Sequence, residues 1–518
     1  MPTAASSTER HRGGTGLLSP AGWRASCADV GHVLRFRAQT VRRGASLWAA
    51  VSLLLVTAAI ALVPAFVGDA GEGPGAVEVA ILLPTGFAAF LLIAIVSAVV
   101  SGGGRELLPR DQAAIHPLSP TSDHLGALLL APLNIAWLLQ AWALLGSAAY
   151  GLGPDTLHTM IPVILLWLAA ATAAAQVVAW AVEAVRRMHG GVVVVRLLGI
   201  TVAVVALWLH VSGRLTSVLD SLPTVWFVVG GVEGVTWRFA ATLAAEAGIF
   251  VVAVLVGALP AHLAARRTAR DEVRLDSAAR EPLPMPRGDL LALVRTDRAS
   301  VWRTVPVRRG MAVLAVGPGL VALAGNLQWA TMTVLPGLVA SGGALLFGVN
   351  VWCLDGRGGL WRESQPVEPG PVFAARAWVL AEFLLLASAI TIALASLRAG
   401  IPSSAELTAL LCTLVVVTIQ VVGAAMRWSM QRPFAADLRS ARATPAPPVV
   451  MVGYSARLAL STTLTGLVFS GLARVPVWEA SVLIAIPFVG WSLTRLARTR
   501  ARWLDPVQRA RVVASVAA

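Results

Sequence analysis

The chain has 518 residues, of which 57% are hydrophobic and 13% are charged, and its formal net charge is +14. Soluble domains carry about 25% charged residues, and disordered chains combine low hydrophobicity with high charge, so both classes are excluded. All 41 basic residues are arginine, which excludes the lysine-dependent phosphate loop of nucleotide-binding proteins. We therefore expect an all-α, polytopic membrane protein that is not an enzyme.

Residues 1–44 are basic and lack the apolar core of a cleavable signal peptide. The segment from Trp23 to Arg43 spaces its apolar residues on one helical face, which predicts an amphipathic helix on the inner membrane surface. A basic flank of the first membrane span is an equally good interpretation of these residues.

Twelve apolar windows follow, each about as long as the 20 residues that a helix needs to cross the hydrocarbon. Six lie in a first half at 45–263 and six in a second half at 309–497, with a cytoplasmic linker at 264–308 and a cytoplasmic tail at 498–518. Within the linker, Asp289 to Trp302 has the spacing of a second amphipathic helix. The predicted spans are 46–67, 77–100, 125–149, 159–184, 191–211, 238–263, 310–326, 329–351, 373–397, 404–426, 450–472 and 477–496.

The arginines predict the orientation, because cytoplasmic loops of membrane proteins are enriched in basic residues. With the N-terminus inside, 37 of the 41 arginines fall on cytoplasmic segments. We therefore expect a multi-pass protein of the bacterial plasma membrane with both termini in the cytoplasm. Its positive charge would face the anionic lipid of the inner leaflet, and no alternation of basic and aromatic residues indicates nucleic-acid binding. The four exceptions are Arg214, Arg238, Arg398 and Arg474.

Two predicted cytoplasmic loops share a pattern. Pro117 and Pro120 follow the second span, and the same Pro-x-x-Pro spacing recurs 249 residues later at Pro366 and Pro369, after the eighth span. Because each loop follows an even-numbered span, the two six-helix repeats are expected to run parallel. Each loop is interpreted as a short polar helix that docks on a partner, or else as a solvated loop that ends in helix-stopping prolines.

Glu106 and Asp355 are also 249 residues apart. The candidate contact residues of the two loops include basic, acidic and apolar side chains. They are Arg105, Glu106, Arg110, Asp111, Pro117 and Pro120 in the first loop, and Asp355, Arg357, Trp361, Pro366 and Pro369 in the second.

With the six-span unit and the basic N-terminal segment, the phrases Gly104-Arg-Glu-Leu-Leu-Pro-Arg-Asp and Asn350-Val-Trp-Cys-Leu-Asp-Gly resemble ABC-2 type exporter permeases. The resemblance implies that the two loops are coupling helices seated on a separate ATPase, with one ATPase copy per loop. ATP and Mg²⁺ would be bound by that partner, and this chain would bind no cofactor. The resemblance also implies a re-entrant hairpin that dips into the membrane from the outer side between the fifth and sixth spans, and Leu215 to Val235 lies at the matching place.

Ionisable residues within membrane spans are costly and are candidates for function. Glu246 and Glu382 lie deepest, and each is interpreted either as pairing two helices or as lining a substrate path. Under the pairing interpretation, Arg238 is a candidate partner of Glu246. Asn134 and Gln140 are further polar candidates.

The two acids leave an ion-coupled secondary transporter as the alternative to an ATP-driven exporter, and a non-transporting membrane scaffold or sensor as a third class. Eight histidines without ligand spacing and three cysteines without a CxxC pair predict no metal site. We also expect no catalytic residue.

Overall fold

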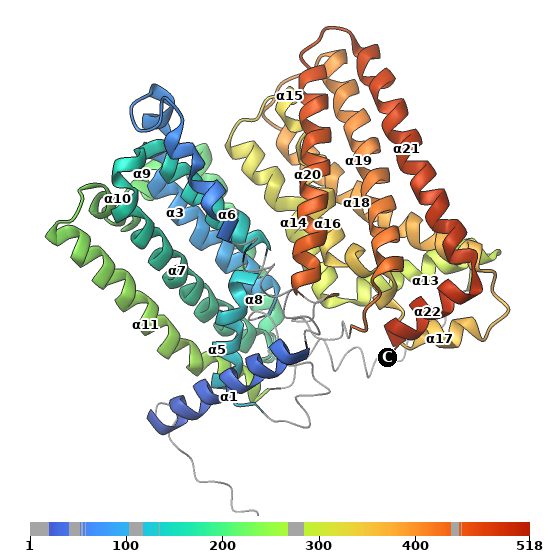
Figure 1. The fold of residues 1–518 in the computed structure, drawn as a ribbon, viewed down its shortest axis with the longest axis horizontal. Helices are drawn as coiled ribbons and strands as arrows, with labels where there is room; N and C mark the ends of the chain where they lie inside the picture. The colour runs from blue at the N-terminus through green and yellow to red at the C-terminus, as the bar shows by residue number, and fades with distance from the viewer. Residues whose placement is uncertain are drawn as a thin grey trace, which may run out of the picture. The chain divides into compact units, whose positions relative to one another are not determined.

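The computed structural model describes residues 20–40, 52, 55–56, 58–102, 118–133, 135–267, 284–436, 445–446 and 448–517. Every regular element within these ranges is a helix, which confirms the all-α class (Figure 1).

Eight helical segments among the described residues are long and apolar enough to cross a membrane. Five of them are single helices: α3 (Pro74–Val100), α11 (Trp237–Ala265), α18 (Pro369–Ser396), α19 (Ser404–Gln431) and α21 (Trp478–Leu504). A sixth consists of η3 (Pro154–Thr156) and α7 (Leu157–Arg186), and a seventh lies within α14 (Val305–Ala324). The eighth comprises α15 (Trp329–Met332), α16 (Leu335–Leu346) and η4 (Gly348–Leu354). These segments support a membrane-spanning protein.

The twelve-span arrangement is not confirmed, because four predicted windows are not among the eight segments. The window at 46–67 is described only in part, and it ends in η1 (Val63–Phe66). The window at 125–149 is interrupted, since α5 (Pro120–Leu130), η2 (Ala131–Leu133) and α6 (Ile135–Leu152) replace one helix. Pro132 lies at that break, where its missing amide hydrogen disfavours a continuous helix. The remaining two windows form α8 (Gly191–Val211) and α20 (Pro448–Leu472).

The chain divides into two compact units inside the predicted linker. Unit 1 comprises Met1–Pro132 and Ala136–Thr268, and unit 2 comprises Leu133–Ile135 and Ala269–Ala518.

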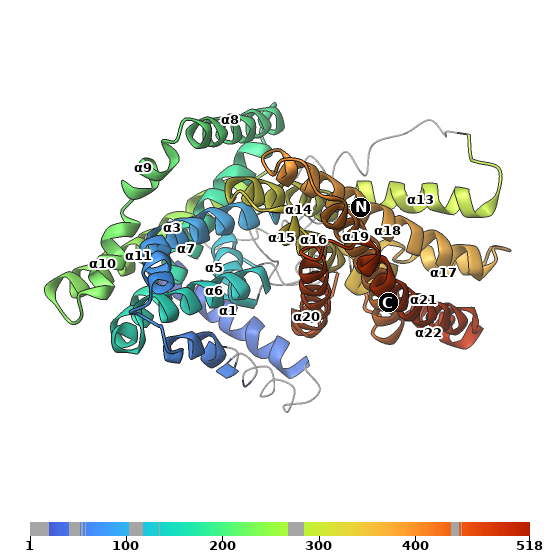
Figure 2. The ribbon, with the colours of Figure 1, turned by 90° about the horizontal axis from the view of Figure 1, so that it is seen from above.

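Unit 1 is built around α3, α7 and α11. Phe87 of α3 and Phe227 of α10 (Thr224–Val232) both pack on Trp167 of α7, with ring centroids 5.6 and 5.4 Å apart. Thr159 ties α7 to α10, because its hydroxyl donates to the carbonyl of Gly231 at 2.7 Å. The short helices α9 (Leu215–Asp220) and α10 occupy the place of the predicted hairpin, and Figure 2 shows them following α8.

Unit 2 packs α14, α16, α18 and α19 around a core that includes Phe347, Phe383 and Val421, all buried. Ser403 and Glu406 form a capping box that begins α19, so each satisfies a backbone amide of the first turn. Beyond the predicted span at 477–496, α21 continues to Leu504 and α22 (Pro506–Ala517) follows it. The predicted tail at 498–518 is thus helical over most of its described length.

The two predicted amphipathic segments form helices. In unit 1, α1 (Pro20–Thr40) lies on α5, with the Ser26 and Ser119 hydroxyls 3.0 Å apart and Val30 packed on the same cluster as Leu130. In unit 2, α13 (Asp289–Arg303) lies on α18. The helices on which they lie, α5 and α18, begin at Pro120 and Pro369. At the first position of a helix the missing amide hydrogen of proline costs nothing.

Candidate functional site

The loop that connects α16 to α18 in unit 2 is the best-defined candidate site. It comprises η4, Asp355, the six-residue helix α17 (Gly358–Glu363) and the segment leading to Pro369; we call these residues, 348–369, the loop site. Asn350 departs from helical geometry within η4, and its side-chain Nδ2 donates to the backbone carbonyls of Phe434 and Pro445 at 2.8 and 2.9 Å. The amide of Val351 donates to the Ser429 hydroxyl at 2.9 Å. These bonds fix where the loop site begins.

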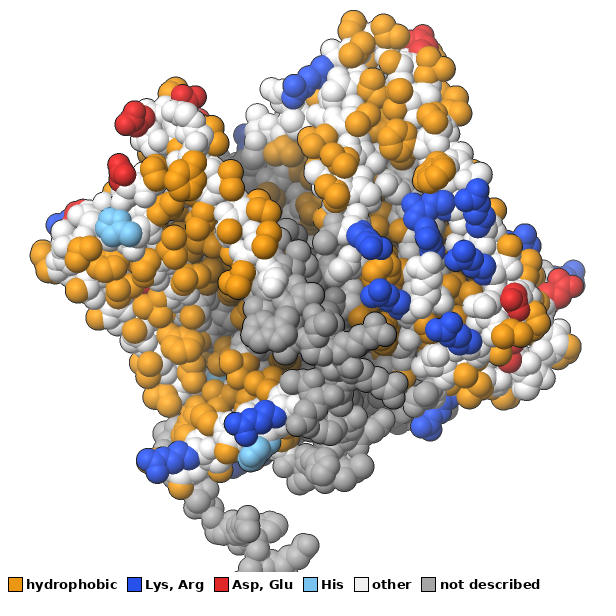
Figure 3. Space-filling model, viewed as in Figure 1, with side chains coloured by type: hydrophobic (Ala, Val, Ile, Leu, Met, Phe, Trp, Pro, Cys, Tyr) orange, Lys and Arg blue, Asp and Glu red, His pale blue; other side chains and the backbone are white. Residues whose placement is uncertain are grey.

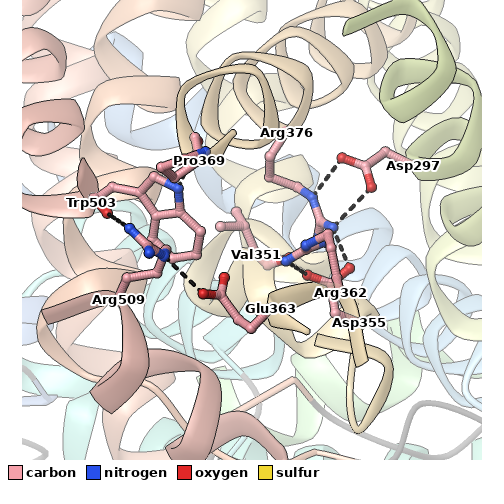
Figure 4. A network of polar contacts seen from close by, with 9 residues as sticks. All are labelled: Asp297, Val351, Asp355, Arg362, Glu363, Pro369, Arg376, Trp503 and Arg509. Atoms are coloured by element: carbon pink, nitrogen blue, oxygen red, sulfur yellow. Dashed lines mark hydrogen bonds and ion pairs between the residues drawn. The ribbon is translucent and has the colours of Figure 1, made fainter. Parts of the chain in front are cut away.

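A buried arginine of α18 holds the loop site (Figure 4). Arg376 is 1% exposed, and its Nε and Nη2 donate to the two carboxylate oxygens of Asp297, each at 2.9 Å. Nη2 also donates to Asp355 at 2.6 Å, and Nη1 donates to the Val351 carbonyl. A guanidinium this buried is tolerated only when it is paired and hydrogen-bonded. Arg376 therefore joins α13, the loop site and α18 at one point.

Arg376, Arg362, Asp297 and Asp355 form an ionic network with two positive and two negative groups. Arg362 of α17 donates to the second oxygen of Asp355 at 2.9 Å, so that carboxylate lies between two guanidiniums. Burial by itself would raise the pKa of the Asp355 carboxyl, but Arg376 and Arg362 outweigh burial and hold that pKa below its ordinary value. Asp355 is therefore ionised at neutral pH and belongs to the internal support of the loop.

The helix α22 packs against α17 from the other side. Arg509 Nε donates to the Glu363 carboxylate at 2.9 Å, and Val513 lies against Gly359. Just before α22, the indole of Trp503 stacks on Trp352 with centroids 3.9 Å apart and planes 1° from parallel. The Trp503 indole nitrogen also donates to the carbonyl of Pro369 at 2.9 Å. Both ends of the loop site are thus fixed to the last helices of unit 2.

The outer face of α17 is apolar and open. Leu360 and Trp361 are 51% and 70% exposed, and Arg357 and Pro366 are also exposed. The candidate contact residues of the second loop therefore separate into two groups. Arg357, Trp361 and Pro366 face outward, whereas Asp355 lies inside the ionic network and Pro369 begins α18.

Most of the first loop lies outside the described residues. This applies to Arg105, Glu106, Arg110, Asp111 and Pro117. Pro120, which is described, begins α5 directly after Ser119, whose hydroxyl caps the helix by accepting from the Ser122 amide at 3.0 Å.

Glu246 and Glu382 occupy different surroundings. Glu382 of α18 accepts from Nε and Nη2 of Arg298 on α13, at 2.9 and 2.6 Å. Glu246 of α11 is 0% exposed, and neither carboxylate oxygen has a hydrogen-bond partner among the described residues. The expected pairing of Glu246 with Arg238 is wrong, because Arg238 instead pairs with Glu233 just before its own helix. Gln140 is partly buried on α6, and Asn134 lies outside the described residues.

Arg376, which holds the loop site from α18, was not predicted as a site residue. From the sequence it was counted among the basic cytoplasmic positions and was not connected with Asp297. A signal was present, since an arginine seven residues into an apolar helix needs a carboxylate nearby. Comparison with known proteins adds no assignment: no protein-family model, curated protein or solved structure matches this chain.

Proposed function

We propose that the chain is the membrane-spanning permease subunit of an ATP-binding-cassette exporter in the bacterial plasma membrane. In this proposal two six-span halves are fused in one chain, both termini are cytoplasmic, and a separate ATPase in two copies supplies the energy. One observation carries the proposal: α17 presents an exposed Trp361 on a short helix that is tied by buried ion pairs to a long apolar helix.

This arrangement suits a contact that transmits force. A push on α17 would reach Asp355 through Arg362, and from Asp355 it would reach α18 through Arg376. The same guanidinium holds Asp297, so α13 would move with α18. The bidentate pair with Asp297 constrains the distance and orientation of the Arg376 guanidinium. Because Asp355 bonds that same buried guanidinium, a displacement of the loop would be passed on to the span.

The test is recovery of the ATPase from native membranes with the tagged, full-length chain. Wild-type protein should retain a subunit with a phosphate-loop sequence, identified by mass spectrometry, and Trp361→Ala should lose most of it because the ring is the largest exposed apolar group of α17. Trp378→Ala is the matched control, since Trp378 is a comparably exposed indole that lies on α18 instead of the loop site. Recovery of no such subunit with the wild-type chain would reject the proposal.

A second candidate function is supported by Glu246. A buried carboxyl without a hydrogen-bond partner among the described residues is expensive at membrane depth, and proton or cation binding would compensate for that cost. This favours an ion-coupled secondary transporter. Substrate movement that needs no ATP, stops with an ionophore and is abolished by Glu246→Gln would replace the first proposal with this one.

A further inference from the structure

Four arginines gather where α19, α20 and α21 lie together in unit 2. Arg432 ends α19, and its Cζ lies 5.0 Å from the ring centroid of Trp428. Arg457 of α20 approaches the same ring, with its Cζ 5.7 Å from the centroid. Arg495 of α21 lies close enough to Arg427 of α19 for the two charges to repel. We call these four residues the arginine cluster.

The arginine cluster differs from the network at Arg376, because no carboxylate among the described residues pairs with it. Within the described part of the chain, none of its four guanidiniums donates a hydrogen bond or forms an ion pair, and only the Trp428 ring faces two of them. A cation over an indole is stabilised, but the ring satisfies none of the N–H donors. Arg432 and Arg457 share one ring and Arg495 is repelled by Arg427, so the local positive potential is raised. An anion with several acceptor oxygens would relieve both deficits.

The surroundings indicate which anion fits. Leu460 and Leu464 of α20 and Leu493 of α21 are exposed apolar side chains near the cluster along the same helices, and Trp491 is 64% exposed one turn before Arg495. Figure 3 shows basic side chains gathered over the lower parts of α20 and α21, with hydrophobic side chains above them. An aromatic residue followed by arginines on one helix is typical of a span that passes from hydrocarbon into headgroups.

We propose that the arginine cluster binds the phosphate of an anionic phospholipid whose acyl chains lie along α20 and α21. The guanidiniums would donate to the phosphate oxygens, as charge-assisted and often bidentate bonds, while the exposed leucines contact the chains. The lipid would connect α19, α20 and α21 through their arginines. This site is independent of the proposed exporter function, because it requires neither an ATPase nor the loop site.

The test is native mass spectrometry of the full-length chain in detergent, titrated with phosphatidylglycerol, with phosphatidylcholine of the same acyl chains, and with inorganic phosphate. Phosphatidylglycerol should bind saturably and more tightly than phosphatidylcholine. Arg432→Gln/Arg457→Gln should weaken phosphatidylglycerol binding about thirtyfold, from about fivefold per arginine at a membrane surface. Equal affinity in the wild-type and double-variant chains would overturn the proposal.

The control is Arg214→Gln/Arg474→Gln, which removes the same charge from two exposed arginines, one of them also over an indole (Arg214 over Trp208). It should leave phosphatidylglycerol binding unchanged, and an equal loss in both double variants would show that only net charge matters and reject a defined site. Inorganic phosphate that competes at concentrations equal to the lipid would mean a soluble phosphate ligand and refute the lipid.

A second measurement needs no variant and covers the case in which the double variant does not fold. Phosphatidylglycerol with a photoreactive headgroup should label the wild-type chain in the peptides that carry residues 427–432 or 448–457. Labelling confined to other peptides would refute the proposal.

Discussion

Replacing Arg376 with methionine should destabilise unit 2 more than any surface substitution. The change leaves two largely buried carboxylates, Asp297 and Asp355, without their shared guanidinium, although Asp355 keeps Arg362. Breaking a buried ion pair by removing one partner costs about 3–5 kcal/mol, because an uncompensated charge remains. With Arg376 1% exposed, solvent screens almost none of this cost.

The second substitution separates the charge from the packing. Adding Asp297→Asn to Arg376→Met removes the uncompensated carboxylate, and we expect this to restore about 1–3 kcal/mol of the loss. The assay is the free energy of unfolding in mixed detergent micelles, followed by circular dichroism. Arg298→Met provides a control with the same chemistry, since its pair with Glu382 is about 40% exposed and such pairs contribute about 0–1 kcal/mol.

Two results would refute this reasoning. A single variant within about 1 kcal/mol of wild type would mean that the network does not stabilise the fold. A double variant no more stable than the single one would mean that the arginine acts by filling space rather than by its charge.

Three further outcomes can be measured in the same detergent system. The lowered pKa of Asp355 stabilises the protein above the carboxyl's unfolded-state pKa of 3.8, and this contribution is lost as pH falls from there through the folded-state pKa. Asp355→Asn should therefore flatten the dependence of the melting temperature on pH below about 4, and an unchanged slope would contradict the network. Gly257→Ala should cost about 1–3 kcal/mol of unfolding free energy, because its Cβ would lie 2.5 Å from the His124 ring. Gly248→Ala on the same helix meets no atom within 4 Å and should be neutral or stabilising by up to about 1 kcal/mol, so equal melting temperatures for the two variants would be inconsistent with tight α5–α11 packing. Trp503→Ala should cost about 3–5 kcal/mol, because the indole is fully buried on Trp352, and it should raise the protease sensitivity of the loop site; a fully protected loop would be the contrary result.

Periodicity and composition predicted the features that depend on local sequence. The helix expected from Asp289 to Trp302 is present as Asp289–Arg303. The loop prolines were interpreted as helix stops, and the structure shows that Pro120 and Pro369 also begin α5 and α18. A hydropathy window, by contrast, averages over about 20 residues and does not detect a break such as that at Pro132. The span count was therefore less secure than the fold class.

The candidate site was predictable only in outline. The position of the second loop and the exposure of Trp361 follow from sequence, because an apolar residue in a polar segment has few neighbours to bury it. The partners of Arg376 do not follow, since Asp297 lies 79 residues away and is brought near only by the packing of α13 on α18. The wrong partner for Glu246 has a different origin, because Arg238 pairs with Glu233, five residues away in sequence.

The seating of α22 on α17 has a consequence for biosynthesis. Arg509 and Glu363 are 146 residues apart, and a ribosome adding about 5–20 residues per second would need roughly 7–30 s to cover that interval. Throughout this delay the loop site lacks Trp503, which stacks on Trp352, and α22, which packs on α17. The surface of α17 would be complete only after α22 has been made, so a chain that stops before α22 would present an incomplete surface.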